Sequence, residues 1–255
     1  MLSAIAVNQI HNIIQEHYNA VIEFVGTSNA ILGVFAYGSM NYGTFQLGKS
    51  DVDTKAIIIP SFDNCIFDHP ISKELHIDNA HCEVKDIRLM IDCYKKQNIN
   101  FVETLFTEFF IINPLYQNIW NRLQLYKNDI AHYNEYQCIQ SVVGQALHTY
   151  KQIKDWNGKK YANLLRLIDF LHSYCLGLPY EICLKPKHLD LIKQVKYSDK
   201  PCLTQEQLDK IYNTLLAYQK KEIKEYKLAN KQIKFVFDNI LDDMIKMALI
   251  QRMLY

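Results

Sequence analysis

Two acidic residues and a glycine-serine pair lie close together in the first quarter of this chain. Gly38 and Ser39 follow an apolar run, and Asp51 and Asp53 open another. In an extended strand side chains alternate, so Asp51 and Asp53 project from one face and Val52 from the other. Two carboxylates this close repel each other unless a proton or a cation lies between them. A hard divalent ion such as Mg²⁺ suits this arrangement.

The Gly38-Ser39 turn predicts an anion at the same place. Glycines at 38 and 43 let the backbone approach a ligand closely, and amide groups at the next helix start, with the Ser39 hydroxyl, can bind phosphate oxygens. Two cations roughly 3.5–4 Å apart can stabilise the attacking and leaving oxygens of a phosphoryl transfer. A metal–nucleotide complex fits both sites. The stretch is not a P-loop, because Thr44-Phe45 stands where Lys-Ser/Thr is required.

The composition is that of an ordinary globular chain. The 255 residues are 49% hydrophobic with a formal net charge of +1, so no strong field draws the whole chain to nucleic acid or membrane. Residues 1–100 carry a charge of −4 and the remainder +5, which suits a cleft for a nucleotide polyphosphate, although scattered surface charge gives the same split. The seven cysteines form no C-x-x-C pair, and we find no signal peptide and no run of ~20 apolar residues. We therefore expect a cytoplasmic protein that does not enter a membrane.

Hydrophobic spacing predicts an α+β fold. Residues 3–25 have helical spacing, 31–37 and 52–59 resemble buried strands, and 81–88 resemble a strand that runs into a helix. We expect residues 61–80 to form a polar loop. From Phe101 onward the pattern is helical, with helices predicted at 114–126, 128–154, 158–176, 188–195, 204–228 and 231–254. The prediction is a mixed β-sheet core with flanking helices over residues 1–127, followed by an all-helical part over 128–255.

A third carboxylate lies on the strand predicted over residues 81–88. If that strand lies beside the one that carries Asp51 and Asp53, either Glu83 or Asp86 can join them, and spacing alone does not choose. His76 and His81 are the histidines nearest the acidic strand. We expect both histidines to be bystanders.

These motifs resemble a known superfamily. The runs YGSMNYG…SDVDTKAIIIPS and HCEVKDIRLMIDCYKKQNINFVETLFT are similar to DNA polymerase beta-like nucleotidyltransferases, in particular to phage and bacterial proteins called simply nucleotidyltransferases. A weaker similarity continues through KKYANLLRLIDFL and GLPYEICL, so the resemblance covers about three quarters of the chain.

The resemblance implies a fold, a reaction and a site. The fold is a nucleotidyltransferase-type sheet followed by a helical domain for nucleotide and acceptor, and the reaction moves an NMP from an NTP to an acceptor hydroxyl or phosphate with release of pyrophosphate. Asp51 and Asp53 take the place of the paired ligands for Mg²⁺ or Mn²⁺, and Gly38 and Ser39 that of the phosphate-binding motif. Glu83 takes the place of the third carboxylate, which is usually Asp.

Basic residues of the helical part are candidates for the triphosphate. The segment from Lys151 to Arg166 is rich in Lys and Arg, and in the resembling family one Lys and one Arg from this region are expected to bind phosphates. We choose Lys151 and Arg166, although a solvated basic helix face explains them equally well. A second basic stretch, Lys220 to Lys234, alternates with acidic residues like an exposed helix face, and with nearby tyrosines is also a candidate RNA surface.

Two other functions fit the same motifs. One is an RNA-end nucleotidyltransferase of repair or tRNA modification. The other is a catalytically silent nucleotide-binding regulator of the same fold, suggested by glutamate at position 83. No motif identifies the NTP or the acceptor, which could be RNA, a protein side chain, a small antibiotic-like molecule or another nucleotide.

Overall fold

The protein is built from one β-sheet and thirteen α-helices over the residues described. The computed structural model describes residues 4–132, 134–153, 155–225 and 231–254, without the side chains of 220–225, 231–238 and 240.

The strands are β1 (Ile31–Ala36), β2 (Thr54–Ile58), β3 (Ser72–Ile77), β4 (Ala80–Asp86) and β5 (Phe110–Ile112). The helices before residue 127 are α1 (Ala4–Val25), α2 (Ser39–Tyr42), α3 (Phe62–Ile66), α4 (Ile87–Lys95), α5 (Ile99–Val102) and α6 (Gln117–Leu125). Those after it are α7 (Lys127–His132), α8 (Glu135–Lys151), α9 (Gly158–Cys175), α10 (Tyr180–Leu184), α11 (Leu189–Lys196), α12 (Gln205–Glu225) and α13 (Lys231–Leu254). Short 3₁₀ turns are η1 (Ser28–Ala30), η2 (Glu103–Phe106) and η3 (Pro114–Tyr116).

The sheet is mixed, with strand order β3-β4-β2-β1-β5. Strands β2 and β4 are parallel neighbours, and the other three pairings are antiparallel. The parallel pairing requires a crossover, which α3 and β3 supply. As a result, the strand that follows Asp51 and Asp53 lies directly beside the strand that carries Glu83.

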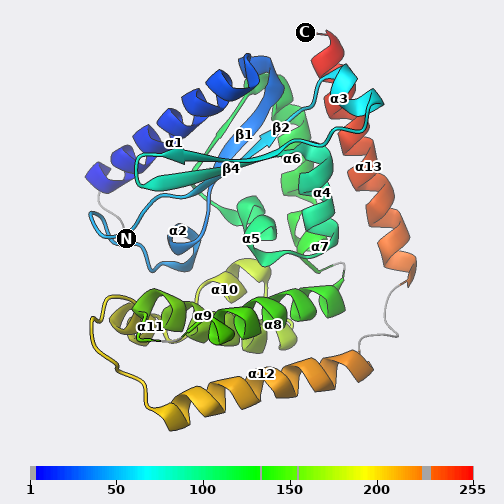
Figure 1. Cartoon of the computed structure of the whole chain (residues 1–255). Helices are drawn as coiled ribbons and strands as arrows, with labels where there is room; N and C mark the ends of the chain where they lie inside the picture. The colour runs from blue at the N-terminus through cyan, green and yellow to red at the C-terminus, as the bar shows by residue number, and fades with distance from the viewer. Residues whose placement is uncertain (1–3, 133, 154, 226–230, 255) are drawn as a thin grey trace.

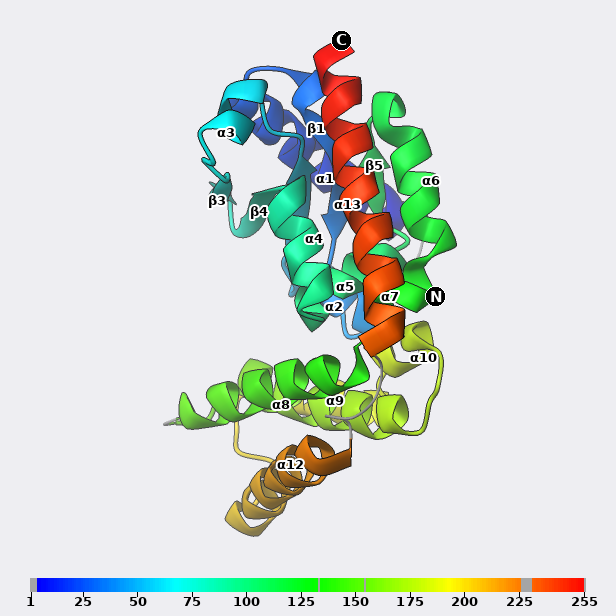
Figure 2. The ribbon, with the colours of Figure 1, turned by 90° about the vertical axis from the view of Figure 1, so that its right-hand side faces the viewer.

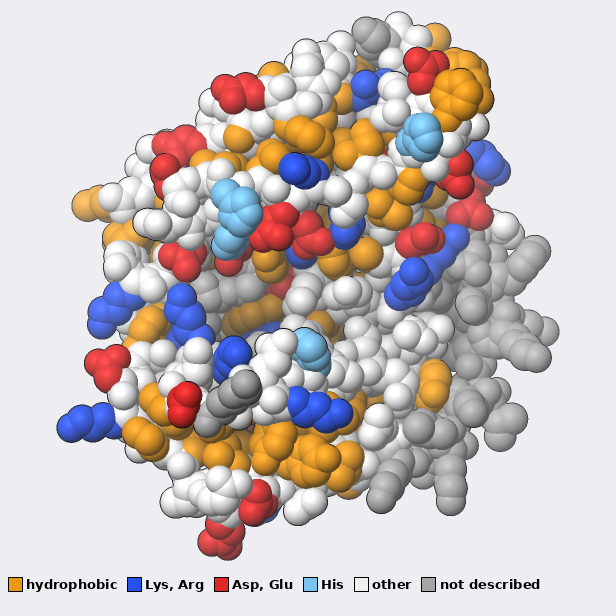
Figure 3. Space-filling model, viewed as in Figure 1, with side chains coloured by type: hydrophobic (Ala, Val, Ile, Leu, Met, Phe, Trp, Pro, Cys, Tyr) orange, Lys and Arg blue, Asp and Glu red, His pale blue; other side chains and the backbone are white. Residues whose placement is uncertain are grey.

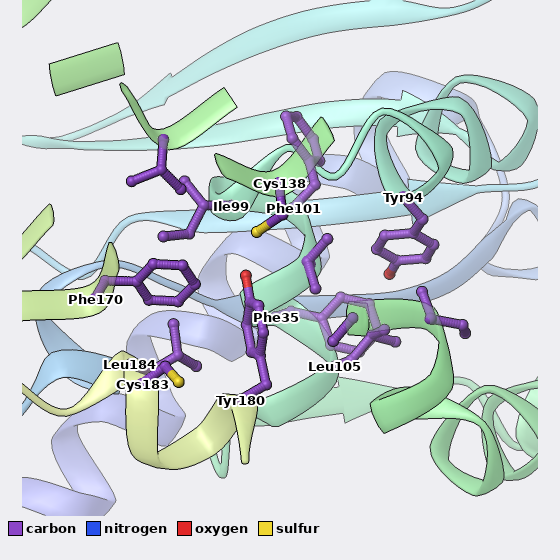
Figure 4. Packing of buried hydrophobic residues seen from close by; sticks show 14 of the residues in the cluster. Phe35, Tyr94, Ile99, Phe101, Leu105, Cys138, Phe170, Tyr180, Cys183 and Leu184 are labelled. Atoms are coloured by element: carbon purple, nitrogen blue, oxygen red, sulfur yellow. The ribbon is translucent and has the colours of Figure 1, made fainter. Parts of the chain in front are cut away.

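Hydrophobic side chains cover both faces of the sheet. On one face, helix α1 buries Ile10, Ile14 and Val21 against strand residues that include Val34 and Ile58. On the other face, one buried cluster runs from the sheet through α4 and α6 into α8, α9 and α10. Figure 4 shows residues of this cluster, among them Phe35 of β1, Leu105 and Tyr180 of α10.

Helices α8, α9, α11 and α12 pack together next to the sheet, and we call this group the helical body. Figures 1 and 2 show α8, α9 and α12 together below the sheet, with α11 beside α9 in Figure 1, whereas α13 returns along α4 and α6. In α13, Leu241, Met244 and Ala248 are fully buried. The boundary predicted near residue 127 stays a prediction, but α13 packs on elements that precede it. No helix in the described part of the chain is long and apolar enough to cross a membrane.

The predicted α+β class is confirmed, with four local differences. The expected helix at 3–25 and the strands at 31–37 and 81–88 are present as α1, β1 and β4. Residues 61–80 are not a loop, because they form α3 and the edge strand β3. The chain after Phe101 is not wholly helical, because Phe110–Ile112 pairs with β1 as β5. The helix predicted over 128–154 is two helices, α7 and α8, and α10 was not predicted.

Candidate functional site

The Gly38-Ser39 turn connects β1 to α2 through a backbone conformation that favours glycine. Gly38 has φ +76° and ψ −129°, and a Cβ placed there would meet no atom within 4 Å. Glycine is therefore required by the backbone angles rather than by lack of space. The Gly38 N–H donates to Glu103 Oε2 at 3.3 Å, so this amide points into the protein.

Glu103 is a buried carboxylate that accepts hydrogen bonds from the Gly38-Ser39 turn and the helix α2 that follows it. Besides Gly38, it accepts hydrogen bonds from Asn41 Nδ2 at 3.1 Å and from the Tyr42 hydroxyl at 2.6 Å. Burial raises the pKa of Glu103, and the charge of Arg166 with these hydrogen bonds offsets the rise only in part. The Arg166 guanidinium lies 3.8 Å from the Tyr42 ring centroid, so the turn, Glu103 and helix α9 form one packed unit.

Asp51 and Asp53 lie in the extended segment just before β2, one on each side of buried Val52. Val52 is 4% exposed and belongs to the cluster under α1. Asp53 extends the strand pairing, since its carbonyl accepts from Tyr37 N at 3.1 Å, and its Oδ1 accepts from the His81 amide at 3.1 Å. Asp51 is more open, with its side chain 46% exposed. Burial therefore alternates across Val52, and the shared face predicted for Asp51 and Asp53 stays a prediction.

Glu83 lies on the neighbouring strand, where the register pairs it with Lys55. Its Oε2 is 2.5 Å from Lys55 Nζ and its Oε1 is 3.1 Å from Lys85 Nζ. Burial acts to raise the pKa of Glu83, but the two ammonium groups outweigh it and hold that pKa below its ordinary value. Glu83 is therefore an ionised carboxylate that lysines neutralise.

Lys55 is the charged residue at the centre of this face. It is 2% exposed, and its ammonium lies 4.1 Å from the Tyr37 ring centroid and 3.9 Å from that of Phe101. Aromatic faces and one carboxylate are favourable surroundings for a buried cation. Asp86, the alternative third carboxylate, instead caps α4 and binds Arg88, with Oδ2 2.8 Å from Nη2. Glu83, not Asp86, thus lies on the same face of the sheet as Asp53 and Lys55, the face opposite helix α1.

The three predicted metal ligands share one end of the sheet without forming a closed set. Among the described residues, only Glu74, His76 and His81 place one ligand atom each within 4.8 Å of the others. Asp51, Asp53 and Glu83 do not meet that condition. Asp51 and Asp53 have accessible carboxylates, whereas Glu83 joins them only if it leaves its lysines.

Helix α9 brings a basic side chain to Asp51. Lys159 Nζ is 3.6 Å from Asp51 Oδ2. The helix begins at Gly158, where a Cβ would lie 2.4 Å from the carbonyl oxygen of Val195, so only glycine lets α9 start this close to α11. The end of α11 in turn holds the 44–50 loop, because the Tyr197 hydroxyl bonds the Thr44 carbonyl at 2.8 Å and Ser50 Oγ at 2.7 Å.

The two predicted phosphate ligands of the helical part lie in different surroundings. Arg166 is buried, 4% exposed, and donates to Asn163 Oδ1 from Nε and Nη2. Lys151 is the exposed last residue of α8. Lys154 and the side chains of the second basic stretch, Lys220 to Lys234, lie outside the described residues. Of the basic segment, Lys159 is the residue paired with a predicted metal ligand.

Acidic and basic side chains both gather on this side of the molecule. Figure 3 shows acidic and histidine side chains gathered over β3 and β4, and Lys and Arg side chains on the helical body below them. A distinct cavity of about 220 Å³ opens on the α1 side of the sheet, next to Asp51 and lined by Ile10, His17 and Phe45. Asp53 and Glu83 do not line it, so the candidate site is the sheet face that carries Asp53 and Glu83, not this cavity.

Sequence reasoning missed Lys55 and Glu103 as parts of the site. Each carried a signal, because a charged residue stands inside an apolar run, TKAIII for Lys55 and FVETLF for Glu103. A buried charge in such a run needs a partner. A search of protein-family models finds none that matches this chain, and a search of curated proteins also finds no match.

Proposed function

We propose that this protein is a metal-dependent nucleotidyltransferase, which moves an NMP from an NTP to an acceptor hydroxyl or phosphate and releases pyrophosphate. The parallel pairing of β2 and β4 carries the proposal, because it sets Asp53 and Glu83 on one face, beside the Gly38-Ser39 turn. A nucleotidyltransferase-type fold accounts for this combination of turn, acidic segment and neighbouring strand.

The donor atoms suit a hard divalent cation. Asp51 and Asp53 offer accessible carboxylate oxygens, the ligands that Mg²⁺ and Mn²⁺ prefer, and these two residues would hold the ion. When bound, the ion would neutralise charge on the phosphates. Glu83 is a weaker candidate ligand, because Lys55 and Lys85 already satisfy both of its oxygens.

The protein's own side chains supply orientation and positive charge. Lys159 faces Asp51 across 3.6 Å, and an exposed lysine at that position can transfer to a phosphate oxygen once a cation satisfies the aspartate. Glu103 keeps the Gly38-Ser39 turn rigid from below. Catalysis in this site is chiefly positioning and charge neutralisation, as is general for phosphoryl transfer.

The test is transfer of label from each of four α-labelled NTPs with Mg²⁺ or Mn²⁺, using RNA and then protein as acceptors. We expect Asp53→Asn to lower transfer by more than about 100-fold. Replacing a residue that only hydrogen-bonds to a metal ligand already costs about 10–100-fold, and Asp53 is a proposed ligand itself. Asparagine keeps the oxygen that accepts from the His81 amide, so the fold should persist. Asp68→Asn is the matched control, because the Asp68 side chain is 96% exposed. Equal transfer by Asp53→Asn and wild type would contradict the proposal.

One observation favours a second candidate, a catalytically silent nucleotide-binding regulator of the same fold. Lys55 and Lys85 together neutralise Glu83 without any metal. Metal-dependent NTP binding without transfer in the same experiment would favour this alternative. Transfer that requires RNA and falls steeply with salt would instead identify an RNA-end nucleotidyltransferase.

A further inference from the structure

The β3–β4 hairpin places four polar side chains in a square on one sheet face. A two-residue turn, Asp78-Asn79, joins the strands, and Asp78 adopts φ +51° to make it. The register sets His76 opposite His81 and Glu74 opposite Glu83. Because side chains alternate along each strand, all four project from the same face. Buried Cys82 and Val84 project from the other.

Three of these four side chains have converged. The Glu74, His76 and His81 ligand atoms all lie within 4.8 Å of one another. Glu74 Oε1 is 3.2 Å from His81 Nδ1, and the two imidazole centroids are 4.7 Å apart with their planes at 77°. The Glu74 and His81 side chains are 59% and 46% exposed, so an ion can reach them from solvent.

Glu83, the fourth side chain, does not join this cluster, because two lysines already hold its carboxylate. Lys55 and Lys85 occupy both oxygens of Glu83. Glu74, by contrast, lies beside the His81 imidazole, with Oε1 3.2 Å from Nδ1. The square thus divides into an anion neutralised by lysines and a carboxylate beside two imidazoles, which are good metal ligands when neutral.

We propose that Glu74, His76 and His81 bind one divalent transition-metal ion of the zinc class. Two imidazole nitrogens and one carboxylate oxygen suit Zn²⁺, Co²⁺ or Ni²⁺ and not Mg²⁺, which prefers oxygen ligands. Three protein ligands leave a coordination position for water or a substrate group. The site is chemically distinct from the oxygen site at Asp51 and Asp53, although the His81 amide bonds Asp53 Oδ1. It reverses the expectation that His76 and His81 are bystanders.

The test is Co²⁺ titration of the full chain followed by visible absorption, with Zn²⁺ titration calorimetry in parallel. The Cys202→Ser background removes the exposed thiol, which would otherwise compete for these ions. We expect one equivalent of Co²⁺ with nitrogen and oxygen ligation, displaced by Zn²⁺ and not by Mg²⁺. His76→Ala and Glu74→Ala should each weaken binding by more than about 100-fold, beyond the 10–100-fold cost of changes behind a ligand.

Control variants make each outcome decisive. His69→Ala removes an exposed histidine outside the cluster and should bind Co²⁺ as the background does. Asp53→Asn should also retain Co²⁺ binding, so failure of the proposed transferase activity would leave this result unaffected. Absence of Co²⁺ binding by the background, or equal binding by His76→Ala, would overturn the proposal. His69, Glu74 and His76 are exposed, and unchanged far-ultraviolet circular dichroism would show that all the variants fold.

Discussion

At the scale of single residues, the site is organised by charges that are already paired. Lys55 is almost fully buried, and its ammonium has one carboxylate and two aromatic faces around it. The cost of burying this charge is met by Glu83. Removing either member alone should therefore cost more than removing both.

Glu83→Ala tests this pairing. We expect a loss of about 2–3 kcal/mol in the free energy of unfolding, because the buried Lys55 ammonium would lose its counter-charge. Glu74→Ala is the matched control, since Glu74 lies opposite in the register but is exposed, and it should cost less than about 0.5 kcal/mol. Lys55→Met combined with Glu83→Leu should recover most of the loss. Urea unfolding measures all three, and equal effects of the two single variants would contradict the pairing.

The pair also predicts how stability depends on pH. The pKa of Glu83 is lower in the folded protein than its ordinary value. The unfolded chain therefore takes up this proton first as the pH falls, and the stabilisation is present above the ordinary glutamate pKa of about 4.3. It is lost as the pH falls through the lowered pKa of the folded state. Glu83→Ala should show a weaker decline than wild type over that range.

At the scale of elements, a buried histidine joins helix α1 to strand β2, which follows Asp51 and Asp53. His17 is 1% exposed, and its Nδ1 lies 2.7 Å from the Thr54 hydroxyl, between Asp53 and Lys55 in the chain. Burial lowers the pKa of His17, and the charge of Asp78 offsets this only in part. Helix α1 thus packs best against β2 when this imidazole is neutral.

Acidification should therefore loosen α1. The unfolded chain binds a proton at His17 near pH 6.5, whereas the folded chain resists it, so stability falls as the pH drops below that value. The fall ends once the folded His17 is itself protonated. His17→Gln should flatten this part of the stability profile between pH 7.5 and 5.5, measured by urea unfolding. His172→Gln, at an exposed position of α9, is the control, and an unchanged slope in His17→Gln would refute the prediction.

The elements that sequence reasoning found and missed differ in burial. Strands β1 and β2 are buried at every position, so an apolar run identifies them. Strands β3 and β5 are the two edges of the sheet, and neither has a fully buried position. In β3, exposed Lys73 interrupts the apolar alternation of Ile71, Leu75 and Ile77, which leaves only a weak pattern to detect. The carboxylates could be predicted from residue type, whereas Lys55 and Glu103 depend on long-range pairing that one segment does not show.

At the scale of the whole molecule, hydrogen bonds from Lys196 and Tyr197 connect the helical body to the 44–50 loop, which precedes Asp51. The Tyr197 hydroxyl bonds the Thr44 carbonyl and Ser50 Oγ, and Lys196 Nζ lies 3.2 Å from the same carbonyl. These contacts join the end of α11 to the 44–50 loop. Asp51, which directly follows this loop, lies 3.6 Å from Lys159 of α9.

Tyr197→Phe should loosen this connection without disturbing the core. The loss of two hydroxyl hydrogen bonds predicts about 1–2 kcal/mol less stability and faster amide exchange in residues 44–53. Hydrogen exchange read by mass spectrometry measures the second effect directly. Tyr212→Phe is the control, because its ring stacks on Tyr150 of α8. Unchanged exchange in the loop would show that Tyr197 does not restrain it.

The return of α13 to the sheet has a consequence for biosynthesis. Arg252 donates to the Ile59 carbonyl and Gln251 to that of Leu115, and between them and Leu241 the helix supplies buried side chains to the first part of the chain. A ribosome delivers residues 1–127 long before these contacts exist. The sheet therefore emerges with the α4–α6 face partly uncovered, and it completes its packing only after residue 252 has left the exit tunnel.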